Sequence, residues 1–426
     1  MTADDSMPPA SLLNAAGSLR PTRAMIDLGA LANHVRIIAT LVAPASMMAV
    51  VKANAYGHGA AMVARTALLN GASSLAVATV DEGIALRDDG IAANILVLGP
   101  VLPGELPVAL KDHLQLTAID PTMSHAAGAL ARQLDLSWRP QFHVKIDSGM
   151  HRFGTDIATA VATAKSINAD PFLELVGVST HFAAAEEATR DVTHQQAAIF
   201  TRFLDELAMA GINPGIRHVA NSAATLRFPT MHLDMVRVGL AMYGLNPSPH
   251  CVLPDSFRPI LRIISRVARI HTLLPGDRVG YGGTFTATCP SQAALIPMGY
   301  ADGYHRSLSS NAWMAIAGQR APVLGRISMD QTVIGVAADA SIGDEVTVMG
   351  DGNHGEPTID EIAVMAGTNA YEIMCGLSGR LPRVYIRDGR MVALQRPWHT
   401  GVHEEAGRTR ASTKKGQPIA RWPEDP

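Results

Sequence analysis

The sequence predicts a two-domain α/β protein: an N-terminal (β/α)8 TIM barrel followed by a C-terminal, mostly antiparallel β domain. The chain has 426 residues, more than one typical domain requires. Between about residues 24 and 243, short apolar runs alternate with helical patterns, and about eight such repeats favour a closed barrel over an open parallel sheet. After about Pro247 the pattern changes to β-rich runs separated by Gly, Pro and Asp turns, which indicates a second architecture.

The candidate barrel strands are short apolar runs without alternation, as expected for strands buried on both faces. The clearest helix between them spans Thr193–Gly211, where apolar residues form one stripe and Gly211 supplies the stop. Nine strand candidates exceed the eight that a barrel needs, so we interpret the ninth as an additional element or a misassigned one. In order they are Ala24–Leu28, Met47–Val51, Leu75–Val80, Ile95–Leu98, Leu114–Ala118, Phe142–Ile146, Leu175–Ser179, Ile216–Val219 and Met235–Val238.

The second domain is predicted from β-rich runs bounded by turns such as Pro275-Gly276-Asp277, together with one helix near Ile359–Gly367. The predicted β segments are Ile260–Leu273, Ala293–Met298, Met314–Ala317, Thr332–Val336 and Glu345–Val348. The resulting domain prediction is a flexible extension over residues 1–22, the barrel over 23–250, the β domain over 251–393 and a disordered tail over 394–426.

Composition excludes several classes of protein. The formal net charge of −3 provides no basic excess of the kind that nucleic-acid binding requires. No uncharged apolar stretch reaches the length of a membrane span, and the acidic start Met1–Asp5 does not resemble a secretory signal. The three cysteines are far apart and form no CxxC pair, which fits a reducing compartment. We therefore expect a cytoplasmic protein without nucleic-acid or membrane partners and without a metal site.

Lys52 is the most informative residue. It directly follows the apolar run Ser46–Val51, and Tyr56 and the turn Gly57-His58-Gly59 come shortly after it. A cation at the mouth of a buried strand is costly without a chemical role. The simpler interpretation is a lysine at a strand end whose amine reaches water.

Polar residues also follow other predicted strands. Since the carboxyl ends of barrel strands meet at one rim, these side chains are expected to converge there. Each of them alone is explained by capping or turn chemistry, but five strand ends converging indicate a site. The residues are Lys52, Lys145, Asp147, Ser148, Arg152, His181, Asn221, Ser222, Arg237 and Gly239.

A phosphate site is also indicated. The segment Gly239–Gly244 follows a strand and could offer backbone amides to an anion, with Ser222 adding a hydroxyl. Glycines after strands more often simply turn the chain. The sequence contains no GxGxxG fingerprint and no Walker lysine, which argues against a nucleotide.

The chain resembles alanine racemases over about residues 24–390. The resemblance rests on many segments rather than on one motif: Lys52–Gly59, Lys145–Arg152, Thr180–Phe182, Ala220–Ala224, Asp234–Gly244, Val279–Gly282, Gly299–Arg306, Gly325–Gln331 and Tyr371-Glu372. It implies a fold-type III pyridoxal 5'-phosphate enzyme that acts as a homodimer with shared active sites and interconverts L- and D-alanine. Such an activity serves D-alanine supply for peptidoglycan or D-alanine catabolism.

The resemblance also implies roles for individual residues. Lys52 would bind the cofactor as a Schiff base and act as one base, and Tyr281 of the partner subunit would be the other. The remaining cofactor residues would be Tyr56, Arg152, His181, Asn221, Ser222, Arg237, Gly239, Leu240 and Tyr371. Arg152 would contact the substrate, and Met329 and Asp330, again from the partner subunit, would complete the substrate pocket. Tyr300, Arg306 and Arg326 would line the entrance, and Lys145 would be a candidate for carbamylation.

The implied chemistry explains these residue types. Racemisation needs a base on each side of a flattened carbanion and a cofactor that spreads the charge. Free lysine and tyrosine have pKa values of about 10.4 and 10. To act as bases near neutral pH, both need surroundings that lower these pKa values, such as cationic neighbours or an imine. Arg237, unlike a carboxylate, cannot readily supply a proton to the pyridine nitrogen.

Three other functions are compatible with parts of this pattern. A fold-type III decarboxylase would carry an acidic partner where this chain has Arg237. A single-barrel binding protein for pyridoxal phosphate would lack the second domain and its Tyr281, Met329 and Asp330. A racemase with a broader substrate range, such as serine, is the nearest rival; periplasmic enzymes of that kind generally carry an export signal, which we do not find.

Overall fold

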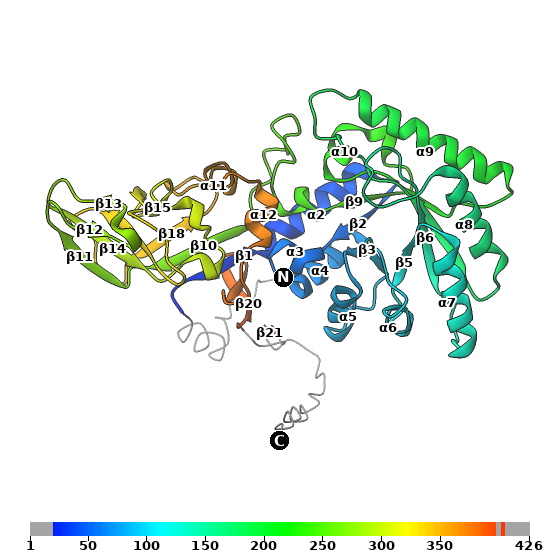
Figure 1. Cartoon of the computed structure of the whole chain (residues 1–426), viewed down its shortest axis with the longest axis horizontal. Coiled ribbons are helices and arrows are strands. Elements are labelled where there is room, and N and C mark those ends of the chain that lie inside the picture. Colours follow the sequence, from blue (N-terminus) through cyan, green and yellow to red (C-terminus); the bar gives the residue numbers. More distant parts are fainter. Residues whose placement is uncertain (1–19, 398–401, 405–426) are drawn as a thin grey trace, which may run out of the picture.

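The computed structural model describes residues 20–397 and 402–404. Figure 1 shows two lobes side by side along the long axis of the molecule, with the barrel in one lobe and the β-rich domain in the other. No helix in the described ranges combines the length and the apolar character needed to cross a bilayer.

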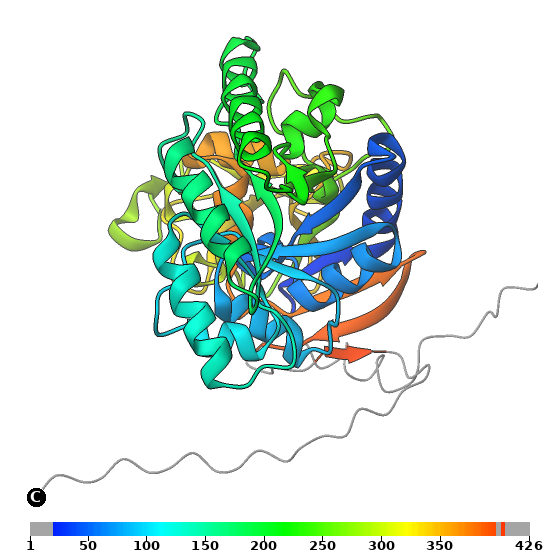
Figure 2. The ribbon, with the colours of Figure 1, turned by 90° about the vertical axis from the view of Figure 1, so that its right-hand side faces the viewer.

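The barrel sheet has eight strands in the order β8-β7-β6-β5-β4-β3-β2-β9, and its neighbouring strands are parallel. These strands are β2 (Ser46–Val50), β3 (Ala72–Val77), β4 (Ile95–Val97), β5 (Gln115–Ala118), β6 (Gln141–Lys145), β7 (Glu174–Ser179), β8 (Ile216–His218) and β9 (Met235–Val238). The turned view in Figure 2 shows helices surrounding these strands. They are α2 (Leu28–Val42), α3 (Lys52–Tyr56), α4 (Ala60–Leu69), α5 (Val80–Asp88), α6 (Leu106–Lys111), α7 (Pro121–Gln133), α8 (Ile157–Ala169), α9 (Asp191–Met209) and α10 (Ser222–Arg227), with the 3₁₀ turns η1 (Pro229–Met231) and η2 (Leu240–Tyr243).

The first and last strands of this sheet, β8 and β9, come together and nearly close it. The amide of Asp234 donates to the carbonyl of Arg217 at 3.2 Å, and the amide of Arg237 donates to the carbonyl of Ala220 at 2.9 Å. An ion pair of 2.7 Å between Arg217 and Asp234 spans the same seam. The predicted barrel class is therefore confirmed.

The predicted long helix is also confirmed, as α9. Its residues Phe200, Phe203 and Leu207 are buried against the barrel, which is what an amphipathic stripe predicts. The helix ends at Met209, and Gly211 shortly after it has a φ of +68°. Glycine adopts this left-handed conformation without a steric penalty, which explains the stop.

The second domain is mostly antiparallel, as predicted. Its largest sheet has the strand order β16-β15-β18-β10-β1-β19-β20-β21, beside a three-stranded sheet β11-β14-β17 and the pair β12-β13. The strands are β10 (Leu261–Arg266), β11 (Arg269–Leu273), β12 (Arg278–Val279), β13 (Phe285–Thr286), β14 (Ser291–Ile296), β15 (Trp313–Ile316), β16 (Gln319–Pro322), β17 (Thr332–Val336), β18 (Glu345–Met349), β19 (Arg383–Arg387), β20 (Arg390–Gln395) and β21 (Val402–Glu404). The helical segments are η3 (Tyr281–Gly283), η4 (Tyr300–Asp302), η5 (Arg306–Leu308), α11 (Ile359–Ala366) and α12 (Ala370–Cys375).

The first predicted barrel strand was assigned to the wrong sheet. The run Ala24–Leu28 forms β1 (Arg23–Asp27), which pairs antiparallel with β10 and parallel with β19 in the second domain. The ninth candidate, Met235–Val238, is the true eighth barrel strand. Local sequence could not reveal this, because a short, mainly apolar run is compatible with either sheet and only its distant partners decide.

The chain ends contain more structure than predicted where they are described. Arg20, in the predicted flexible extension, pairs with buried Asp302 at 2.6 Å, and Thr22 shares a 2.7 Å hydrogen bond with Ser265. In the predicted disordered tail, Val402–Glu404 forms β21 on the edge of β20. The rest of both segments, residues 1–19, 398–401 and 405–426, lies outside the described residues.

Candidate active site

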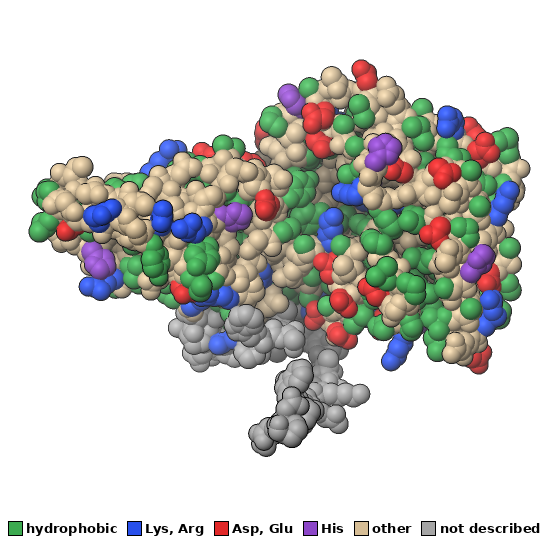
Figure 3. Space-filling view, in the orientation of Figure 1, with side chains coloured by type: hydrophobic (Ala, Val, Ile, Leu, Met, Phe, Trp, Pro, Cys, Tyr) green, Lys and Arg blue, Asp and Glu red, His purple; other side chains and the backbone are tan. Residues whose placement is uncertain are grey.

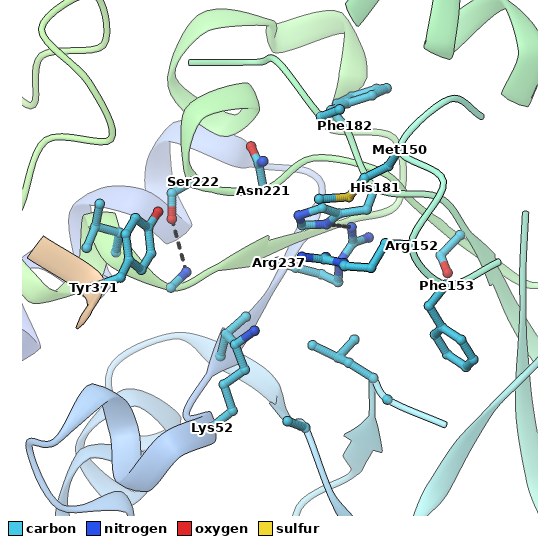
Figure 4. Close-up of a pocket in the computed structure, with 18 of the residues that line it drawn as sticks. Lys52, Met150, Arg152, Phe153, His181, Phe182, Asn221, Ser222, Arg237 and Tyr371 are labelled. Atoms are coloured by element: carbon cyan, nitrogen blue, oxygen red, sulfur yellow. Dashed lines mark hydrogen bonds between the residues drawn. The ribbon is translucent and has the colours of Figure 1, made fainter. Parts of the chain in front are cut away.

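A cavity of about 750 Å³ opens at the carboxyl ends of the barrel strands. It brings together eleven of the predicted site residues, namely Lys52, Tyr56, Lys145, Arg152, His181, Asn221, Ser222, Arg237, Gly239, Leu240 and Tyr371. Figure 3 shows the surface hollowed between the two lobes, and Figure 4 shows how the side chains point into this space. Four of the lining residues are lysine or arginine and one, Glu186, is acidic, so the cavity favours an anion.

Lys52 is positioned by an unusual backbone turn. It lies two residues after the end of β2, and the next four residues, Ala53 to Tyr56, all have φ values of 52–53°, in the left-handed region. That conformation costs non-glycine residues about 1–2 kcal/mol each, so neighbouring groups must hold the turn. Gly57 ends it in a conformation that glycine favours, and a Cβ there would overlap the carbonyl of Met374 in α12.

Glu82 is one of the groups that hold this turn. Its Oε1 accepts from the amide of Ala53 at 2.6 Å, and its Oε2 accepts from the amide of Ala78 at 2.7 Å. The same carboxylate forms the capping box at the start of α5 with Thr79. Glu82 therefore fixes the backbone beside Lys52.

The charge of Lys52 is destabilised by its surroundings. Burial is the main cause that lowers the pKa of its amine from 10.5, and the positive charge of Arg152 lowers it further. Glu82 opposes both effects. A lysine with a lowered pKa is more often neutral and hence a better nucleophile and base.

Arg237 lies on the floor of the cavity, buried and heavily bonded. Its Nη1 donates to Nδ1 and to the carbonyl of His218, at 2.9 and 2.6 Å. Its Nη2 donates to the carbonyl of Thr180 at 2.7 Å and to Nδ1 of His181 at 3.1 Å. Burial lowers the pKa of Arg237 to about 10, so the guanidinium stays charged at neutral pH.

Arg237 also determines which nitrogen of His181 carries a proton. A guanidinium only donates, so Nδ1 of His181 must accept and the proton of the neutral ring is on Nε2. Burial, with Arg237 and the nearby lysines adding to it, holds the pKa of His181 well below 6.5. His181 is therefore neutral, with one N–H free to donate on its other side.

Ser222 and Gly239 form a small cradle beside the cavity. Ser222 Oγ accepts from the amide of Gly239 at 3.0 Å (Figure 4) and from the amide of Ala241 at 3.3 Å. A Cβ at Gly239 would lie 2.5 Å from the hydroxyl of Tyr56, so only glycine leaves this space open. Asn221 caps α10 by accepting from the amide of Ala224 at 2.9 Å. Its side-chain oxygen therefore has a structural role at the start of this helix.

The loop after β6 places Arg152. Asp147 Oδ1 accepts from the amides of Gly149, Met150 and His151 at 2.9–3.1 Å and so organises the turn. At the end of β6, Lys145 lies with its amine 5.1 Å from the centre of the Phe153 ring. Burial lowers the pKa of Lys145 from 10.5 to about 7, helped by Arg237, Arg152 and Lys52.

Of the predicted site residues in the second domain, Tyr371 of α12 lines this cavity and six others do not reach it. Tyr281, Tyr300, Arg306, Arg326, Met329 and Asp330 are all exposed, and none of them lines it. Tyr281 is 72% exposed, at the tip beside β12. Gly280 before it has a φ of +73°, which suits the glycine found there. Within one chain, then, these six residues stay separate from the cavity.

Some residues of the site were missed. Glu186, Phe153 and Cys375 line the cavity, and Glu82 lies beneath it. Only Glu82 had a sequence signal, the capping pattern Thr79-x-x-Glu82 at the end of the predicted strand Leu75–Val80. Cys375 comes from α12 of the second domain, and no local pattern links it to a barrel strand.

A barrel with a lysine, a buried arginine and a hydroxyl-lined cradle at its strand ends, joined to an antiparallel β domain, is an enzyme with its active site at that rim. The comparisons specify which enzyme family. The alanine racemase N-terminal domain family matches residues 26–247, and the alanine racemase C-terminal domain family matches residues 260–385. The chain therefore belongs to the alanine racemase family and is an isomerase.

Individual similar proteins support this family assignment. An alanine racemase of Symbiobacterium thermophilum is 41% identical over 369 residues, covering 86% of this chain and 97% of the relative. An alanine racemase of Geobacillus stearothermophilus is 40% identical, covering 88% and 96%. The crystal structure of alanine racemase from Bacillus anthracis with bound L-Ala-P is 37% identical with a TM-score of 0.84, covering 89% and 98%. A histidine racemase from Leuconostoc mesenteroides is also similar, with 26% identity and a TM-score of 0.80, covering 87% and 99%.

Proposed function

We propose that the protein interconverts L-alanine and D-alanine with pyridoxal 5'-phosphate, using Lys52 and a partner subunit's Tyr281 as its two bases. The observation that carries the proposal is the cavity itself, where a lysine of lowered pKa faces a buried arginine beside an anion cradle. The family membership and the names of the relatives support alanine as the substrate.

The residues present fit the cofactor. Ser222, Gly239 and Tyr56 suit a phosphate, since a Cβ at Gly239 would fill the cradle. All hydrogen bonds of Arg237 found in the described structure leave from its Nη atoms, so its Nε–H is available for a ring nitrogen in the cavity. When bound, pyridoxal phosphate supplies an electron sink that stabilises negative charge on the substrate Cα.

Different residues of the protein then carry out proton transfer, substrate binding and charge stabilisation. Lys52 Nζ holds the cofactor and exchanges the Cα proton on one face, which corresponds to D-alanine in the family. The Tyr281 hydroxyl exchanges it on the opposite face, which corresponds to L-alanine. Arg152 orients the substrate carboxylate, and the partner subunit's Met329 and the partner subunit's Asp330 complete the pocket. Arg237 keeps a positive charge opposite the ring nitrogen without readily releasing a proton.

A homodimer with shared sites would explain why Tyr281 is so exposed. In one chain its side chain is 72% exposed and does not line the cavity. Met329 at 52% and Tyr300 at 42% are exposed on the same domain. Two-fold pairing would bring each β domain to the other chain's barrel rim, since a symmetric contact is reciprocal.

The first test is direct. The purified protein, saturated with pyridoxal phosphate, should show the visible absorbance of a lysine-linked cofactor and should convert either enantiomer of alanine into a 1:1 mixture. Serine and histidine, assayed in parallel, measure the breadth of the substrate range, which the similarity to a histidine racemase makes relevant. Protein that binds no cofactor, or that binds it and racemises no amino acid, would refute the proposal.

Lys145 provides a pH-dependent prediction. Burial and three neighbouring cations lower its pKa from 10.5 to about 7, so its amine is an ammonium below that pH and increasingly neutral above it. Only the neutral amine adds CO₂. In ¹³C-bicarbonate the carbamate signal should therefore be weak at pH 6 and grow as pH rises through 7. The measurement is ¹³C NMR; Lys145→Gln should abolish the signal and Lys165→Gln, on the exposed surface of α8, should not. A signal independent of Lys145 would contradict the assignment.

A further inference from the structure

A chain of hydrogen bonds runs from Arg237 through the inside of the barrel to its opposite end. Its five links join Arg237 to His218 at 2.9 Å, His218 to His143 at 2.9 Å, His143 to Gln115 at 3.2 Å, Gln115 to Gln141 at 2.8 Å and Gln141 to Glu174 at 3.0 Å. His218 is the last residue of β8, whereas Gln115, Gln141 and Glu174 are the first residues of β5, β6 and β7. The chain therefore connects the carboxyl ends of the strands with their amino ends.

Both ends impose the same direction on this chain. Arg237 can only donate, so Nδ1 of His218 accepts and its Nε2–H donates to Nδ1 of His143. The Nε2–H of His143 then donates to Oε1 of Gln115. At the other end an ionised Glu174 can only accept, so Gln141 must present its amide N–H to it, and Oε1 of Gln141 accepts from Gln115. No link requires two donors or two acceptors to face each other.

A glycine makes the central link possible. His143 is on β6 and His218 is on β8, and β7 lies between them in the sheet. Gly177 of β7 is paired with His143, and a Cβ there would overlap Nδ1 of the His143 ring. Because Gly177 has no side chain, the two rings meet across β7, edge to face, with centroids 4.9 Å apart.

The chain of hydrogen bonds also connects the buried, charged Arg237 with the carboxylate of Glu174. Among residues 20–397 and 402–404 no carboxylate forms an ion pair with Arg237. His143 and His218 are 1% and 0% exposed and Gln115 is 7% exposed, whereas Glu174 is half-buried at the barrel end. Burial and Arg237 keep the pKa of both rings far below 6.5, so both stay neutral. Neutral, polarised groups in a low dielectric strengthen one another along such a chain.

We propose that Gln115, Gln141 and Glu174 are positioning residues for Arg237, which act through His143 and His218 across the barrel. By fixing the tautomer of each ring they hold Nη1 of Arg237 in place, while Thr180, His181 and Val219 accept from Nη2, so that the Nε–H faces the cavity. The importance of that orientation for turnover rests on the proposed function, but the hydrogen-bond chain itself is a property of the protein without cofactor.

The test uses ¹⁵N NMR of full-length protein stripped of cofactor and labelled in histidine and arginine. The ring nitrogens of His143 and His218, assigned from His143→Gln and His218→Gln, should each show an unprotonated Nδ1 and a protonated Nε2. A proton on Nδ1 of either ring would overturn the proposal. The NMR signals do not depend on turnover, so they can be compared with a separate racemase assay. Inactive protein with these signals would refute the proposed function alone, and active protein without them would refute this inference alone.

Matched variants separate hydrogen bonding from packing. Gln115→Met and Gln115→Glu have similar volume, but only Glu retains the oxygen that accepts from His143. Met should shift the Nε2 signal of His143, the ring signals of His218 and the Nε–H signal of Arg237. Glu can no longer donate to Gln141 but still accepts from His143, so it should keep the His143 Nε2–H hydrogen-bonded and shift this signal less than Met does. Equal spectra for the two variants would mean that Gln115 only fills space.

A second pair tests the chain at its other end and keeps the proposal testable if Gln115→Met does not fold. Glu174→Met removes the last acceptor, and we expect the His143 ring signals to shift in the same direction as in Gln115→Met, by less. Glu206→Gln removes a negative charge from the exposed surface of α9 and should shift none of them. Unchanged His143 signals in Glu174→Met would overturn the role of Glu174.

Discussion

Replacing Tyr281 by phenylalanine should lower the turnover of L-alanine by about 10²–10⁴-fold, the usual contribution of one general acid or base. The change deletes only a hydroxyl from a side chain that is 72% exposed and outside the cavity, so folding and cofactor binding should be unaffected. Steady-state assays from both enantiomers measure the loss. In D₂O, Lys52 should still exchange the Cα hydrogen of D-alanine, whereas exchange from L-alanine should fall with turnover.

Tyr300→Phe is the matched control. Tyr300 is another exposed tyrosine of the same domain, 42% exposed, and was predicted to line the entrance rather than to transfer a proton. Its hydroxyl should matter for KM more than for kcat. If Tyr281→Phe retained near-normal turnover from L-alanine, or if both variants lost the same activity, Tyr281 would not be the second base.

The residues of the barrel rim were predictable because their geometry is local. Lys52, His181 and Arg237 each lie at or just after a strand end, and the barrel fold alone sends those ends to one place. The sequence could not predict the left-handed turn that follows Lys52. Asn54 tolerates positive φ, but Ala53, Ala55 and Tyr56 disfavour it. That turn depends on distant partners, among them Glu82 and the close approach of Gly57 to α12.

Residues that depend on long-range pairing were harder to predict. Strand β1 resembles a barrel strand in its composition, yet its neighbours β10 and β19 are more than 200 residues away in the chain. Gln115, Gln141 and Glu174 look like ordinary strand starts, and only the packing around Gly177 connects them with Arg237. Tyr281 is exposed in a single chain, so neither its local sequence nor its neighbours in that chain indicate what it contacts.

A heterodimer that combines a Lys52→Ala chain with a Tyr281→Phe chain should regain activity that neither homodimer has. If each site pairs Lys52 of one chain with Tyr281 of the other, one of the two sites in the heterodimer has both bases intact. Two different affinity tags allow the heterodimer to be purified after coexpression. Its specific activity should be about half that of the wild type, because a two-fold dimer has two equivalent sites.

The reciprocal combination makes the result decisive. When a Lys52→Ala/Tyr281→Phe chain is paired with a wild-type chain, shared sites place one lesion in each site, so activity should fall to that of the single variants. Sites built within one chain give the reverse pattern, in which the wild-type chain retains its own site and about half the activity, while the first heterodimer stays inactive. The two heterodimers contain the same two substitutions, so differences in folding or cofactor loading cannot produce opposite activities. Opposite activities can arise only from whether the Tyr281 that faces Lys52 belongs to the same chain or to the partner chain.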